Sequence, residues 1–247
     1  MSSKLAKTGF SLTEVLLAVA TLAIGMLFIA GTFLAGIYLT AVAAERTTAA
    51  VVADEAFAKI KLYGINVNPG DPNRTVAFLR PFEDVAARRP VPEEEFAYPS
   101  TNLDISEKQY YWSALCRRVD PNGASRPSRL VQVTVFVSRK TASAASYQGG
   151  AGWPIPMSVN VSGTTASNLL VIEEANKTTW INDGYTIVDS YTGTIYRVLQ
   201  RRVDQPNTIE LDGPWQGSPG VRVWVVPPPV GSGKDPCIAV YQKVMRF

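Results

Sequence analysis

The main feature of the hydrophobic pattern is a single long apolar run near the N-terminus. From Val15 to Ala44 there are 30 residues without a charged side chain, and Glu14 is the only charged residue between Lys7 and Glu45. As an α-helix this run would be about 45 Å long, which exceeds the roughly 30 Å of bilayer hydrocarbon. The pattern therefore predicts a membrane-spanning helix that continues beyond the membrane.

The helical pattern continues after this run in amphipathic form. Apolar residues recur at helical spacing from Ala49 to Ile60, as expected for a helix with one buried face. No proline or glycine interrupts this part, and Gly64 is a residue type that commonly ends helices. We expect one helix from Phe10 to about Tyr63, membrane-spanning in its first half and packed on a head domain in its second.

The remaining residues show strand patterns separated by turn-rich segments. In the first β head region, residues 64–140, the runs 110–119 and 130–138 predict a hairpin that packs on the helix. Residues 141–167 have the composition of a loop or linker, and residues 168–247 contain short strand-like runs typical of an antiparallel sheet or small barrel. The expected fold class is α+β, with a long N-terminal helix, an antiparallel β head and a second small all-β region.

Composition and charge exclude several classes of function. The chain has 24 Lys and Arg residues against 21 Asp and Glu residues, and no basic run longer than two, so nothing indicates nucleic-acid binding. It contains no histidine, the commonest general base and a common zinc ligand. We find no constellation of catalytic residues, no metal-binding motif and no cofactor motif, and we therefore expect that the protein is not an enzyme.

The two cysteines, Cys116 and Cys237, are too far apart in sequence for a CxxC metal or redox motif. They are expected either to form a disulfide, which an oxidising compartment would favour, or to be two buried thiols.

The residues that flank the apolar run predict its orientation. Lys4 and Lys7 precede it, so the positive-inside rule places the N-terminus in the cytoplasm and the head outside. A cleaved secretory signal is one alternative, since residues 41–43 have a small-x-small pattern, but the apolar cores of such signals are only about 7 to 15 residues long. An unprocessed signal anchor is another, but it gives no reason for Glu14, because carboxylates within membrane helices are costly.

A short motif overlaps the start of the apolar run, and its sequence is Gly9-Phe10-Ser11-Leu12-Thr13-Glu14-Val15. It resembles the cleavage and methylation motif of type IV prepilins and type II secretion pseudopilins, and the apolar run looks closest to V-type minor pilins or I-type minor pseudopilins. The resemblance implies a leader peptide, residues 1–9, that prepilin peptidase removes between Gly9 and Phe10. It also implies N-methylation of Phe10 and retention of helix 10–63 in the mature protein.

The same resemblance implies a structural function. The chain would be a subunit of a type IV pilus or type II secretion-like filament, assembled from the bacterial inner membrane. Glu14 would be its assembly residue, and its carboxylate would pair with the Phe10 amine of a neighbouring subunit. The implied partners are prepilin peptidase, other pilin-like subunits, an inner-membrane assembly platform and the lipid bilayer. An alternative is a membrane-anchored extracytoplasmic binding protein or adhesin that uses the helix only as a tether.

Overall fold

A computed structural model describes most of the chain. The described residues are 11–66, 78–100, 104–119, 129–141, 145–218, 220–232 and 234–247. The chain divides into two compact units, Met1–Glu45 and Arg46–Phe247.

Helix α1 (Leu12–Tyr63) confirms the long helix expected from the sequence. Its last residue, Tyr63, is followed by Gly64, which adopts a φ of +69° and donates its backbone N–H to the carbonyl of Ile60 at 3.0 Å. A residue with positive φ directly after a helix is most often glycine, because glycine has no Cβ to clash in this conformation. The predicted start at Phe10 lies outside the described residues.

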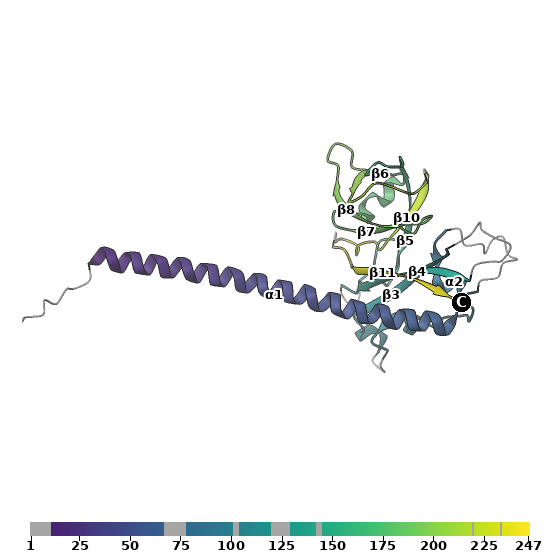
Figure 1. Ribbon diagram of the computed structural model, residues 1–247, viewed down its shortest axis with the longest axis horizontal. Helices are drawn as coiled ribbons and strands as arrows, with labels where there is room; N and C mark the ends of the chain where they lie inside the picture. Colours follow the sequence, from purple (N-terminus) through teal and green to yellow (C-terminus); the bar gives the residue numbers. More distant parts are fainter. Residues whose placement is uncertain are drawn as a thin grey trace, which may run out of the picture. The chain divides into compact units, whose positions relative to one another are not determined.

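A five-stranded antiparallel sheet forms the centre of the second unit (Figure 1). Its long strands follow the order β3, β4 and β11, and β1 and β2 each pair with the other edge of β3. The strands are β1 (Arg80–Pro81), β2 (Ala97–Tyr98), β3 (Tyr110–Arg118), β4 (Leu130–Arg139) and β11 (Cys237–Arg246). The β3–β4 pair confirms the hairpin predicted from residues 110–119 and 130–138.

One face of this sheet packs on the second half of α1. The buried stripe of the helix, which includes Val52, Ala56 and Ile60, shares a hydrophobic core with Val133 and Val135 of β4. Short helical segments complete the connections between strands: α2 (Phe82–Val85), η1 (Glu93–Phe96), η2 (Ile105–Glu107) and η3 (Ala175–Trp180).

Six further strands form a closed antiparallel barrel in the order β10-β5-β6-β9-β8-β7 (Figure 1). Closure leaves a barrel without a free edge, and the interior of a barrel this small is filled by side chains. Here the filling includes Trp215, Tyr196 and Ile187. The strands are β5 (Met157–Gly163), β6 (Leu169–Ile172), β7 (Thr186–Asp189), β8 (Ile195–Arg201), β9 (Thr208–Leu211) and β10 (Val221–Val225).

The barrel packs on the face of the sheet opposite to α1. Leu115 and Phe136 of the sheet form a separate apolar cluster with Val188 and Val226 from the barrel side. As a result, residues 131–138 of β4 are buried without interruption. The four alternating valines of β4, from Val131 to Val137, indicate a single apolar face, and the barrel that covers the other face comes later in the sequence.

The strand pairing differs from the expected organisation in two places. Strand β5 lies within residues 141–167, the expected loop or linker, and β11 pairs with β4 rather than with the second β region. The barrel is therefore inserted in the connection between two neighbouring strands of the central sheet. Local patterns identify strands but carry no information on which distant strand each one joins.

Polar contacts also connect the barrel to the sheet, at the tip of the β7–β8 hairpin. Arg117 on β3 donates to the carbonyl of Tyr191 at 2.8 Å, and Gln242 on β11 donates to the carbonyl of Gly193 at 2.8 Å. Gly193 has a φ of +74°, and a Cβ placed there would lie 2.8 Å from the side-chain nitrogen of Gln132. The hairpin tip therefore fits closely onto the sheet because it lacks a side chain at this position.

Candidate functional site

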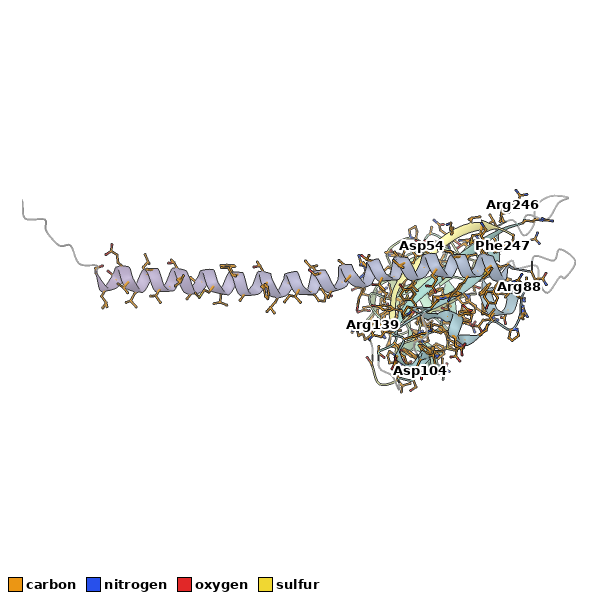
Figure 2. The ribbon with its side chains drawn as sticks, turned by 90° about the horizontal axis from the view of Figure 1, so that it is seen from below. Asp54, Arg88, Asp104, Arg139, Arg246 and Phe247 are labelled. Atoms are coloured by element: carbon orange, nitrogen blue, oxygen red, sulfur yellow. The ribbon has the colours of Figure 1, made fainter. Side chains whose placement is uncertain are left out.

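The first half of α1 exposes apolar side chains on all sides (Figure 2). Leu27 and Phe28, which are neighbours and therefore point in different directions, are 74% and 72% exposed. The helix includes an 18-residue window with a mean hydropathy of 2.3, none of which is buried within the protein. By its length and composition, α1 can therefore cross a membrane.

Glu14 lies in the first turn of α1, and its contacts are local. The Glu14 carboxylate accepts the backbone N–H of Ser11 at 3.2 Å, and the Glu14 backbone N–H lies 3.3 Å from the Ser11 hydroxyl, which accepts it. This reciprocal arrangement is a capping box, in which an N-cap serine and a glutamate three residues later satisfy two free N–H groups of the helix start.

The capping box is a role for Glu14 that the sequence reasoning missed. Its signal was visible, because a serine followed three residues later by glutamate before an apolar run is the sequence mark of this cap. The structure therefore provides a reason for Glu14 that applies to a single chain, without any neighbour. Gly9 and Phe10, the residues of the expected processing site, lie outside the described residues.

The second half of α1 is attached to the head by Lys59, which is largely buried. Its ammonium lies 3.0 Å from the carboxylates of both Glu55 and Glu95, and it donates to the Glu95 carbonyl at 2.8 Å and to the Ser100 hydroxyl at 2.7 Å. The indole N–H of Trp112 donates to the same carbonyl at 2.9 Å. Glu95, part of the densest acidic run of the sequence, therefore has a structural role as an anchor for the helix.

The structure does not bring Cys116 and Cys237 together, and both are free cysteines. Cys116 lies opposite Val133 and belongs to the core that faces α1, whereas Cys237 lies opposite Ser138 and packs in the cluster that faces the barrel. A disulfide requires Cα atoms within about 7 Å, which opposite faces and distant register positions do not allow. The expected disulfide is therefore corrected to two separate thiols, and burial raises the pKa of each.

Asp235 is the carboxyl group whose pKa burial raises furthest among the described residues. It is half-buried in the connection between β10 and β11, and desolvation raises its pKa to about 7. The backbone N–H of Cys237 donates to it at 2.8 Å and partly opposes this shift. Within the described ranges no group of three or more His, Cys, Asp or Glu side chains could hold a metal ion.

A cleft of about 540 Å³ lies between the β1 edge of the sheet and strand β10 of the barrel. Arg80, Asp84, Arg222 and Trp224 are among its lining residues. This mixture of charges and one indole ring does not define a ligand.

Comparisons with known proteins found no match to a family model, a curated protein or a solved structure.

Proposed function

We propose that the chain is a pilin-like structural subunit, a minor pilin or minor pseudopilin of a type IV pilus or type II secretion-like filament. The observation that carries the proposal is the division of α1. Its first half presents an unbroken apolar surface that nothing in its own unit covers, and its second half is packed into a folded head. A protein that must be stored in a bilayer and then packed against other helices needs both properties in one element.

The charge of Glu14 suits such an assembly. A carboxylate in an apolar bundle of helices costs several kcal/mol unless it meets a group of opposite charge. Cleavage between Gly9 and Phe10 would create a new α-amine, and the Glu14 carboxylate of a neighbouring subunit is its counter-charge. Pairing of this kind is head-to-tail and does not close, which is the symmetry that produces helical filaments.

The proposed subunit is an inner-membrane protein before it enters a filament. The N-terminus lies in the cytoplasm, α1 crosses the inner membrane once, and the head lies on the extracytoplasmic side until the subunit enters a filament. Prepilin peptidase removes residues 1–9, and Phe10 is N-methylated. Other pilin-like subunits, the inner-membrane assembly platform and the lipid bilayer are the remaining partners.

A second candidate is an anchored binding protein or adhesin in which α1 only tethers the head. The capping box favours it, because Ser11 and Glu14 then form a local helix start and the carboxylate needs no further partner. The two candidates differ in one property, which is whether the negative charge of Glu14 has a use beyond the cap.

Two substitutions separate the cap from the charge. Glutamine can replace glutamate in a capping box, so Glu14→Gln keeps the helix start and removes only the charge. Glu14→Leu removes both. Each variant is expressed beside the wild type, membrane levels are matched, and co-purification with other pilin-like subunits is measured.

For a filament subunit we expect both variants to be lost from assemblies by about two to four orders of magnitude, since an unpaired member of a buried ion pair costs about 3 to 5 kcal/mol. Insertion into the membrane should remain normal for both. If Glu14→Gln assembles as well as wild type, the carboxylate serves only the cap, and the tethered binding protein becomes the better account.

A further inference from the structure

Strand β11 forms the only long open edge among the strands that the structure describes. The barrel is closed, and the other edge of the central sheet is occupied by β1 and β2, which have two residues each. Proline interrupts that edge, at Pro81 within β1 and at Pro99 directly after β2. Short strands and prolines are the usual means by which proteins prevent further strands from pairing with an edge.

Strand β11 has none of these protections. It contains ten residues without a proline, and within the described part of the chain it pairs only with β4. Its one lysine, Lys243, places its ammonium over the ring of Phe57 on α1, 5.7 Å from the ring centre, and so turns away from the open edge. Gln242, Lys243 and Val244 are all exposed.

The register shows which main-chain groups face the open edge. The backbone N–H of Phe247 donates to the carbonyl of Arg129 at 3.0 Å, which makes these two residues a hydrogen-bonded pair. Such pairs alternate with pairs whose N–H and C=O groups point away from the neighbouring strand. Met245, Lys243 and Tyr241 are therefore bonded to β4.

Residues 242, 244 and 246 alternate with these bonded residues, and they direct their N–H and C=O groups away from β4, towards the open edge. No hydrogen bond from another described residue reaches these groups.

The charge of the exposed half of β11, from Gln242 to Arg246, indicates what kind of strand would pair with its open edge. The strand carries no carboxylate, its Arg246 is exposed, and the adjacent Arg129 is also exposed. Figure 2 labels Arg246 and Phe247 at the C-terminal end of β11, where this exposed half ends. An incoming strand with acidic side chains would meet opposite charges here, and opposite-charge neighbours across strands are stabilising.

We propose that the β11 edge, from Gln242 to Arg246, is a docking site for an extended, acidic segment of another polypeptide, which adds to the sheet as a further strand. Main-chain hydrogen bonds to residues 242, 244 and 246 hold the segment, and its acidic side chains pair with Arg246 and its neighbours. This site is independent of the Glu14 assembly mechanism, because it lies in the head.

The test uses the full-length chain in detergent micelles and a synthetic eight-residue peptide of alternating valine and glutamate with blocked ends. A peptide with lysine in place of glutamate is the charge control. Val244→Pro removes one outward N–H without breaking a bond to β4, and Val244→Ala is the matched variant that keeps this N–H. We expect the proline variant to bind the acidic peptide about tenfold more weakly, the cost of about one lost hydrogen bond, and the alanine variant to bind like wild type.

Amide hydrogen exchange provides a second readout that does not depend on any variant. In the free protein, amides 242, 244 and 246 should exchange rapidly and amides 241, 243 and 245 slowly, and the acidic peptide should protect the first group. Slow exchange of the inward amides in Val244→Pro also shows that this variant is folded.

Three results would overturn the proposal. The first is protection of the outward amides in the free chain, which means that the edge is already covered. The second is failure of the acidic peptide to bind, or equal binding of the lysine peptide. The third is wild-type binding by a folded Val244→Pro.

Discussion

The two halves of α1 distribute their apolar side chains in different ways. In residues 12–45 these side chains point in all directions and remain exposed within their own unit. In residues 46–63 they form a stripe, with Val52, Ala56 and Ile60 fully buried against the sheet. Polar and charged residues occupy most of the remaining surface of this second half. One continuous helix therefore contains a half that needs an apolar solvent or other helices, and a half that is part of the core of the head.

The largest expected effect compares the same substitution in both halves. Ile60→Ala removes a fully buried side chain and should lower the free energy of unfolding of the head by about 2 to 5 kcal/mol. Ile24→Ala, in the exposed half, should leave it unchanged. Urea unfolding in detergent, followed by tryptophan fluorescence, measures both. Equal destabilisation by the two variants would show that the halves do not differ as described.

A substitution at Lys59 tests whether polar contacts hold the second half of α1 to the head. Lys59→Met keeps most of the side-chain volume but leaves Glu55 and Glu95 without their shared cation, and we expect a loss of about 1 to 3 kcal/mol. Lys61→Met is the control, because Lys61 is exposed on the same helix. The difference in urea midpoint between the two variants is the measurement, and a difference near zero would mean that the buried cation does not anchor the helix.

A substitution at Gly193 tests whether the barrel belongs to the same packed body as the second half of α1. Gly193→Ala places a Cβ against Gln132 in a left-handed conformation, whereas Gly220→Ala has a similar φ of +69° but open space around it. The conformational cost of about 1 to 2 kcal/mol should apply to both, and an additional loss should appear only at Gly193. Hydrogen exchange should show that this loss extends to amides in residues 46–63. If the loss of protection were confined to barrel amides, the barrel and the second half of α1 would not belong to one packed body.

A further expected effect is the pH dependence due to Asp235. Burial raises its pKa to about 7 in the folded protein, above the value of about 3.9 in an unfolded chain, so the folded state binds more protons between these values. Stability from this group is therefore fully present below about pH 4 and is lost as the pH rises towards 7. Asp235→Asn should remove this component from urea midpoints measured between pH 4 and 8, and an unchanged pH profile would contradict the assignment.

The sequence was sufficient for features that depend on local periodicity. The long helix, its end at Gly64 and the β3–β4 hairpin could all be predicted, because each follows from spacing within a few turns or one strand pair. It was also sufficient for the capping box of Ser11 and Glu14, because a serine followed three residues later by glutamate before an apolar run marks this cap.

Features that depend on distant pairing could not be predicted. Strand β11 has the same local pattern whether it joins the barrel or the sheet, and only the register with β4 decides between them. The same holds for Cys116 and Cys237, which lie on opposite faces of one sheet, because sequence separation does not indicate the face on which a side chain lies. The valine alternation of β4 identified one buried face and could not reveal the barrel on the other.

The most direct test of the proposed function is the N-terminus of the native protein. Intact mass and N-terminal sequencing of protein purified from its own membrane should show a chain that begins at an N-methylated Phe10, with residues 1–9 removed and helix 10–63 retained. A chain that begins near Ala44 would show a secretory signal, and a chain that still begins at Met1 would show an unprocessed anchor. Either result would contradict the proposal that this protein is a pilin-like subunit.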